Sequence, residues 1–478
     1  MKILFLTPPA LDGKPAPERV FGCNYGIYPL PNLFLLYPAA MLRNGGHQVE
    51  ILDYPAQERA IDQFHRDMLE RRDDLVVFST VFLSKTTDLL ARDVIRKASP
   101  GTRFLFVSTE PTASPAPFLA ADSWVIRGEP ELVIVPFAEH LAGNKDPSLL
   151  PGVSALSAGA TPAIHAPLVV EDLDALPFPD RTLLPTRNYF NPKLGIQPFT
   201  IALASRGCSF GCYYCVPNAL SFAREIEHKR NRQCKPPVRL HSAERVIEEC
   251  RRLASEGYKA VSFVDDQFVW GVDRTQHICE GIAPLGLTWS CLARADMLQD
   301  PVMVHAMARA GCKYIDIGVE SFDQRILDRI GKGLEISHIY RAVENLKSAG
   351  IEPEINLLLG SCPLETSRTI RHSFRKLLEL DVDYVLFSAC TPFPHTEFHQ
   401  IARERGWMIE PEYRPIDPIK QAFITYPHLP ARRIEILLRL MYLYFYYRPS
   451  YIYKRLTHLT SWSDFLNKAR AALTILVR

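Results

Sequence analysis

Hydrophobic residues in the first part of the chain form short continuous runs separated by amphipathic stretches. These runs occupy residues 2–6, 49–53, 75–79, 103–107 and 124–127. Continuous apolar runs, as opposed to alternating ones, are typical of parallel strands covered by helices on both faces. The pattern predicts an α/β fold that begins with a doubly wound, Rossmann-like domain over residues 1–143.

The composition and the hydrophobic pattern change over residues 144–196, which are rich in proline and alanine and show little periodicity. Proline removes a backbone donor and opposes both helices and central strands. We therefore expect a linker here.

Alternation returns after the linker. Strands are expected at residues 199–204, 260–264, 287–291, 314–319, 354–359 and 384–387, with helices at 243–254, 301–310 and 336–349. Repeated β–α units indicate a barrel, here a partial (β/α)6 barrel over residues 197–410. Residues 411–478 are expected to form a helical, aromatic C-terminal extension.

Composition narrows the class of protein. Apolar residues at 47% and charged residues at 23% are ordinary for a soluble globular protein, and a net charge of +2 gives no reason to expect a nucleic-acid partner. The eleven cysteines follow no secreted pattern, no cleavable signal precedes the first strand, and no apolar run is long enough to span a bilayer. We expect a cytoplasmic protein.

Three cysteines, Cys208, Cys212 and Cys215, follow the run at 199–204 with C-x3-C-x2-C spacing. Thiolates are soft ligands that favour iron–sulfur clusters or zinc. A [4Fe–4S] cluster ordinarily takes four cysteines, so three would leave one iron open to an exogenous ligand. The alternative is a structural zinc site completed by Cys234, although zinc sites usually have two close pairs of ligands.

The same loop carries Arg206-Gly207 before the first cysteine and the aromatic Tyr214 before the third. In these features it resembles the cluster loop of radical S-adenosylmethionine (SAM) enzymes. The resemblance implies a [4Fe–4S] cluster, SAM, a 5′-deoxyadenosyl radical and an external one-electron reductant of the flavodoxin or ferredoxin type.

Polar and turn residues stand where the barrel strands end, and barrels of this kind act at the carboxyl ends of their strands. The resemblance implies that SAM contacts come from Tyr214, Asp265, Asp266, Arg294, Glu320, Ser321 and Phe393. The alternative for the acidic residues is that they cap the helices that follow.

The first domain resembles the cobalamin-binding domain of a subfamily of these enzymes. The similar segments are Thr7-Pro8-Pro9, Gly46-His47-Gln48-Val49 with Asp53, and Gly128-Glu129-Pro130-Glu131. Ligands of such sheets lie at the carboxyl ends of the strands. The resemblance therefore implies cobalamin contacts at Thr7, Pro8, Pro9, Ser79, Thr80, Ser108, Thr109, Glu110, Gly128 and Glu129. The Asp-x-His-x-x-Gly motif for a lower axial histidine is absent, and a domain without cofactor is the alternative.

These features together predict a metal-binding, cobalamin-dependent radical SAM methyltransferase that methylates an unactivated carbon of a small molecule. A radical SAM enzyme that closes or oxidises rings without methyl transfer, like the anaerobic cyclase of chlorophyll synthesis, is the second hypothesis. A non-enzymatic, zinc-stabilised cobalamin-binding module is the third.

The extension carries the aromatic and basic stretch 437–455. It fits either a helix packed on the barrel or an interfacial helix in peripheral contact with a membrane. Its apolar character favours a lipid, terpenoid or tetrapyrrole-like substrate.

Overall fold

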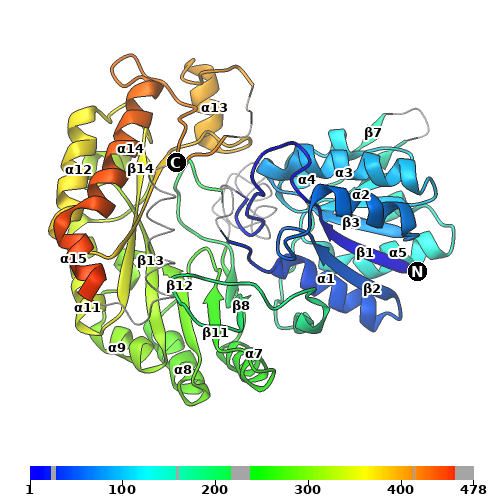
Figure 1. Cartoon of the computed structure of the whole chain (residues 1–478), viewed down its shortest axis with the longest axis horizontal. Coiled ribbons are helices and arrows are strands. Elements are labelled where there is room, and N and C mark those ends of the chain that lie inside the picture. Colours follow the sequence, from blue (N-terminus) through cyan, green and yellow to red (C-terminus); the bar gives the residue numbers. More distant parts are fainter. Residues whose placement is uncertain (23–27, 158–160, 217–236, 413, 415, 458–478) are drawn as a thin grey trace. The chain divides into compact units, whose positions relative to one another are not determined.

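The computed structural model describes residues 1–22, 28–157, 161–216, 237–412, 414 and 416–457 (Figure 1). The chain forms two compact units. Unit 1 comprises residues 1–209, 216–292 and 306–313, and unit 2 comprises residues 210–215, 293–305 and 314–478.

Unit 1 opens with a seven-stranded sheet of order β2-β1-β3-β4-β5-β6-β7. Its strands are β1 (Lys2–Thr7), β2 (Gln48–Asp53), β3 (Leu75–Ser79), β4 (Arg103–Val107), β5 (Ser123–Ile126), β6 (Val153–Leu156) and β7 (Pro162–Ala163). The first five are parallel, and β6 and β7 are antiparallel additions at one edge. The expected doubly wound domain is confirmed.

Helices cover both faces of this sheet. They are α1 (Leu33–Asn44), α2 (Ile61–Glu70), α3 (Lys85–Ala98), α4 (Thr109–Ala113) and α5 (Ile134–Ala142). Alternate strand residues such as Leu4, Val76 and Phe104 pack with Phe64 of α2 and Ile95 of α3. Because their neighbours along β1, β3 and β4 are also buried, the central parts of these three strands are apolar on both faces, as the sequence pattern requires.

Strands β6 and β7 lie within residues 144–196, where a linker without regular structure was expected. Pro162 opens the two-residue edge strand β7, a position at which a missing backbone donor breaks no internal ladder. The proline-rich composition therefore concealed a short extension of the sheet.

The second sheet has the order β15-β14-β13-β12-β11-β8. Its strands are β8 (Phe199–Ala202), β11 (Ala260–Phe263), β12 (Thr288–Ala293), β13 (Cys312–Glu320), β14 (Glu352–Leu359) and β15 (Tyr384–Ala389). Its helices are α7 (Ala243–Ser255), α8 (Val272–Ile282), α9 (Pro301–Arg309), α10 (Gln324–Arg329), α11 (Ile336–Ser348) and α12 (Ser367–Glu379), followed by α13 (Glu397–Glu404), α14 (Ala431–Tyr447) and α15 (Pro449–Thr457). Parallel pairing and alternating helices confirm the partial (β/α)6 barrel.

Helix α14 packs against β15 in unit 2. The Tyr442 hydroxyl lies 2.9 Å from the Phe387 amide nitrogen and 2.8 Å from its carbonyl oxygen, and the Tyr446 hydroxyl is placed in the same way against Val385. The inner face of α14 therefore packs on the barrel. No helix in the described part of the chain is long and apolar enough to cross a bilayer.

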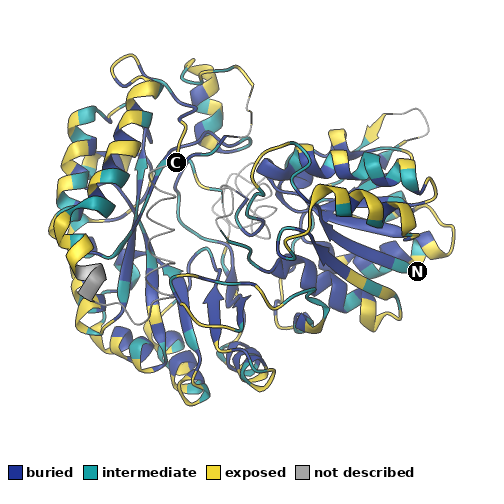
Figure 2. Ribbon diagram, viewed as in Figure 1, coloured by how far each residue is buried: buried dark blue, intermediate teal, exposed yellow. Residues whose placement is uncertain are grey.

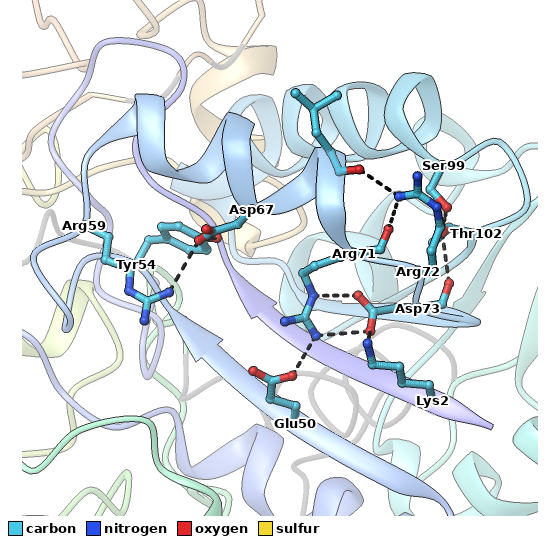
Figure 3. Close-up of polar contacts among 11 residues, drawn as sticks. Lys2, Glu50, Tyr54, Arg59, Asp67, Arg71, Arg72, Asp73, Ser99 and Thr102 are labelled. Carbon is cyan, nitrogen blue, oxygen red and sulfur yellow. Dashed lines mark hydrogen bonds and ion pairs between the residues drawn. The ribbon is translucent and has the colours of Figure 1, made fainter.

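A cluster of charged side chains links strand β2 to the segment that precedes β3 in the first sheet (Figure 3). Arg71 donates through Nε and Nη2 to the Asp73 carboxylate, at 2.7 and 3.1 Å, and through Nη2 to Glu50 at 2.7 Å. The two acidic partners differ in burial, because the Asp73 side chain is 3% exposed and that of Glu50 is 48% exposed. Buried hydrogen bonds to charged groups contribute more to stability than exposed ion pairs do.

We expect Asp73→Asn to lower the free energy of unfolding by about 2 kcal/mol. Glu50→Gln removes the negative charge of the exposed partner of Arg71. It should lower the free energy of unfolding by about 0.5 kcal/mol or less. Urea unfolding of the two variants measures the difference, and equal losses would show that burial does not set the strength of this cluster.

Candidate active site

The strand that leads into the cysteine loop is held by a buried charge network. Strand β9 (Ser205–Arg206) pairs antiparallel with β10 (Arg239–Leu240), which places Arg206 directly opposite Arg239. Two arginines side by side in a core need compensating charge. Glu131 provides it to Arg206 at 2.7 Å, and Glu129 to Arg239 at 2.7 Å and Arg206 at 3.5 Å.

The centre of this network is fully buried. The side chains of Arg206, Glu129 and Glu131 are all 0% exposed, and the Arg206 guanidinium lies 5.1 Å from the centre of the Tyr37 ring. Burial alone would lower the pKa of Arg206, but the carboxylates of Glu131 and Glu129 raise it. Because a buried charge without a partner is strongly destabilising, this network fixes the backbone two residues before Cys208.

Two predicted SAM residues that follow β11 also contact this strand in unit 1. Asp265 is fully buried and accepts hydrogen bonds from the Ala204 amide, at 3.0 Å, and from the Ser205 hydroxyl. Burial raises the pKa of Asp265 to about 7, and those hydrogen bonds oppose the shift. Asp266 accepts from the Gly207 amide at 3.2 Å. Both carboxylates therefore contact the backbone just before Cys208, and their contact with SAM remains a prediction.

The three cysteines follow at once. Cys208 is half-buried, Cys212 is buried and Cys215 is exposed. Gly207, in the left-handed region at φ +95°, turns the chain into the loop. Three thiols within eight residues are a donor set that suits an iron–sulfur cluster with one open iron.

The zinc alternative is not tested by the structure. Its fourth ligand, Cys234, lies outside the described residues. Among the residues that are described, no three His, Cys, Asp or Glu side chains are grouped to hold a single metal ion.

The second half of the loop is anchored within unit 2. Tyr213 donates its amide to the Ile330 carbonyl at 3.2 Å and its hydroxyl to the Ser361 carbonyl. A side chain at Gly331 would lie 2.6 Å from the Gly211 carbonyl, so only glycine lets this turn approach the loop.

Arg294, predicted to contact SAM, lies against the loop. Its guanidinium is 3.5 Å from the centre of the Phe210 ring and donates to the Asp296 carboxylate at 3.0 and 2.9 Å. Asp296 escaped the sequence analysis, although an acid two residues after an arginine is a common partner. The planar guanidinium of Arg294 therefore lies where it can support the loop or pair with a carboxylate through two nitrogens.

Glu320 and Lys332 form a buried ion pair, with 2.8 Å between Oε1 and Nζ. Glu320 has φ +68°, a strained conformation for a residue with a side chain. Burial would lower the pKa of Lys332, but Glu320 and Cys212 raise it. Lys332 was missed by sequence reasoning, and its setting between Gly331 and Gly333 was the available signal.

The remaining predicted SAM residues are also in unit 2. The Ser321 hydroxyl lies 3.2 Å from that of Ser373, and Phe393 is buried in the turn after β15. Burial raises the pKa of Tyr214, and the Glu320 carboxylate raises it further. In unit 2, Arg294 and Glu320 therefore lie near the loop that contains Tyr214. Contact of these three residues with SAM is still a prediction.

The ten residues predicted to contact cobalamin stand at or just beyond the carboxyl ends of neighbouring strands in unit 1. Thr7, Pro8 and Pro9 follow β1, and Ser79 and Thr80 follow β3, while Ser108, Thr109 and Glu110 follow β4 and Gly128 and Glu129 follow β5. Because β1, β3, β4 and β5 are adjacent, this is one edge of the sheet. Cobalamin contact at this edge stays a prediction.

Several of these side chains already have protein partners. The Thr80 hydroxyl donates to Asp88 at 2.8 Å, and Lys85 pairs with Glu110 at 2.8 Å. Gly128 has φ +89°, and a side chain there would meet the Leu168 carbonyl at 2.1 Å. The Ser79 hydroxyl, in contrast, is buried with no hydrogen-bond partner among the described residues. An unpaired polar group at this edge fits a site for a polar ligand.

A family model of the radical SAM superfamily matches residues 203–362, which begin just before the cysteine loop and end after β14. The chain contains a radical SAM domain. The predicted resemblance of the cysteine loop is confirmed by this match.

Three named relatives align with most of the chain. A protein of Pyrococcus horikoshii named an uncharacterized methyltransferase is 29% identical over 95% of this chain and 94% of its own length. The hopanoid C-3 methylase of Methylococcus capsulatus is 28% identical over 82% of this chain and 71% of its own. An anaerobic magnesium-protoporphyrin IX monomethyl ester cyclase of Cereibacter sphaeroides is 23% identical over 81% and 63%.

Among solved structures, the radical SAM methyltransferase TsrM of Kitasatospora setae, with a SAM analogue and tryptophan bound, has a TM-score of 0.64 at 16% identity. The similarity covers 88% of this chain and 80% of TsrM. At this identity the likeness supports the fold alone.

The charge network before the loop can be tested with a matched pair of variants. Glu131→Gln leaves Arg206 with only the more distant Glu129, so we expect a loss of about 3 kcal/mol in stability and severalfold less iron after anaerobic reconstitution. Glu249→Gln removes the partner of another buried arginine, Arg181, at 2.6 Å. The control should lose similar stability and keep its iron. Equal iron in both variants would show that the network does not position the loop.

Proposed function

We propose that this chain is a cobalamin-dependent radical SAM enzyme that methylates an unactivated carbon of a small apolar molecule. The observation that carries the proposal is the three-cysteine loop within the matched radical SAM domain, which a doubly wound domain precedes in the sequence. The methyltransferase names of two relatives, one of them matched over nearly its full length, support the choice of reaction.

The cofactors supply the difficult chemistry. When bound, a reduced [4Fe–4S] cluster would supply the electron for cleavage of SAM to a 5′-deoxyadenosyl radical, and cobalamin would supply the methyl group. The residues that would hold the cluster are Cys208, Cys212 and Cys215.

The protein's part is to bind and orient. Arg294 has the planar fork that pairs with a carboxylate, and Glu320 can accept from an ammonium group if it exchanges its present partner, Lys332. Both are less than a tenth exposed, so a ligand bound there is shielded from water. For cobalamin, the edge that contains the unpaired Ser79 hydroxyl is the proposed site.

The substrate is a small molecule, and a lipid, terpenoid or tetrapyrrole is its proposed class. This choice is supported by the names of the relatives, which act on a hopanoid and on a magnesium-protoporphyrin ester. We further infer an external one-electron reductant, because the electron must come from outside the protein. A reducing, cytoplasmic compartment fits ligand cysteines that must stay as thiolates.

Ring formation without methyl transfer is the second candidate function, favoured by the cyclase relative. The two candidates differ in the fate of the SAM methyl group. Methyl transfer requires that group to move from sulfur to reduced cobalamin, with S-adenosylhomocysteine as the leaving group. Ring formation does not require it.

This difference can be measured before the substrate is known. We expect anaerobic protein, loaded with cobalamin, reduced and given methyl-labelled SAM, to accumulate label on the bound cobalamin and release S-adenosylhomocysteine in equal amount. Cobalamin that stays unlabelled while 5′-deoxyadenosine forms would favour the cyclase candidate. Free cobalamin under the same conditions is the control for non-enzymatic methylation.

A further inference from the structure

Helices α12 and α14 lie side by side on the outside of the barrel in unit 2 (Figure 1). The rings of Phe374 and Tyr444 are 5.7 Å apart, and Arg433 Nε donates to the Ser367 hydroxyl at 3.3 Å. The inner side of α14 is buried through Leu437, Met441 and their neighbours. The outer sides of the two helices therefore form one surface, here called the α12–α14 face.

This face is strongly basic. Seven arginines and lysines lie on the two helices, against only two acids, Glu379 and Glu435. Glu379 is paired with Lys376, and the Glu435 carboxylate accepts from the Ala422 amide. The exposed arginines are Arg368, Arg371, Arg375, Arg432, Arg433 and Arg439. Figure 2 shows exposed segments along the outer sides of both helices. Since the whole chain carries a net charge of only +2, positive charge is concentrated here.

The arginines of the face are not neutralised by their neighbours. Within the described part of the chain, Arg368, Arg371, Arg375, Arg432 and Arg439 form no ion pair. Other exposed arginines do, for example Arg251 and Arg252 with Glu248. Exposed like charges repel one another, and an anionic partner that covers them would relieve this repulsion.

Large apolar side chains stand among these arginines. Ile436, Leu440 and Tyr444, spaced four residues apart on α14, are 40%, 54% and 61% exposed, and Tyr453 on α15 is 71% exposed. Residues at this spacing share one side of a helix. A helix face that combines arginine with leucine, isoleucine and tyrosine is typical of helices that lie in the plane of a membrane interface.

We propose that the α12–α14 face binds the surface of an anionic bilayer. The arginines meet lipid phosphates and anionic headgroups, while Ile436, Leu440 and Tyr444 enter the boundary with the acyl chains. An acidic protein would satisfy the charge but would give these protruding side chains no apolar layer to enter, so the combination favours lipid. The proposal is independent of the reaction, since it concerns only the outer side of the barrel.

Flotation of the full chain with vesicles tests the proposal. We expect binding to phosphatidylcholine vesicles that contain phosphatidylglycerol, weak binding to phosphatidylcholine alone, and loss of binding as salt is raised. The triple variant R371Q/R375Q/R439Q should partition about a hundredfold more weakly, since each cation near an anionic surface contributes about a factor of five. Leu440→Ser with Tyr444→Ser should also weaken partitioning.

The matched control is R251Q/R252Q/R414Q, which removes the same charge from exposed arginines that are paired with Glu248 and Glu410. It should bind vesicles like the unmodified protein. Equal weakening in both triple variants would overturn the proposal. Failure to bind either kind of vesicle would also overturn it, and so would salt-sensitive binding to an acidic electron-carrier protein without binding to vesicles. Vesicle binding by protein that fails to methylate cobalamin would leave the proposal standing.

Discussion

The placement of the cysteine loop depends on one buried arrangement of charge. Arg206 and Arg239 are neighbours across a two-residue ladder, and like charges cannot share a dry core unless acids neutralise them. Glu129 and Glu131 do so from the turn after β5, a segment separated from β9 by more than seventy residues. A chemically reactive loop is thus attached to a rigid sheet by interactions that are expensive to break.

The same principle recurs around the loop. Asp265 and Asp266 hold its first residues by their backbone amides, Tyr213 holds its second half by backbone carbonyls, and Arg294 stacks on Phe210. These contacts hold the backbone of the loop in place and leave the three thiols available as ligands. Such preorganisation matters for a cofactor whose reactive product must be kept away from solvent.

Much of the fold could be predicted, because most strands are marked in the sequence by a continuous run of apolar residues. The run at residues 75–79 matches β3, and helix α7 ends one residue beyond its expected end. Short edge strands such as β7 could not be predicted, because a proline-bearing pair of residues has no pattern of its own. At the site, the three cysteines are predicted from their spacing together with the neighbouring Arg206-Gly207 and Tyr214. Arg239 was missed because its partner, Glu129, is distant in the sequence, and Lys332 was missed because its ion pair with Glu320 forms only in the fold. Glu129, which is predicted to contact cobalamin, also pairs with two arginines.

The account as a whole depends on a cluster with three thiolate ligands and one open iron. Electron paramagnetic resonance of the anaerobically reconstituted, reduced protein, recorded before and after addition of SAM, tests this most directly. We predict the signal of a reduced [4Fe–4S] cluster that shifts when SAM binds the open iron. A spectrum that SAM leaves unchanged, or a protein that carries zinc in place of iron, would contradict the account.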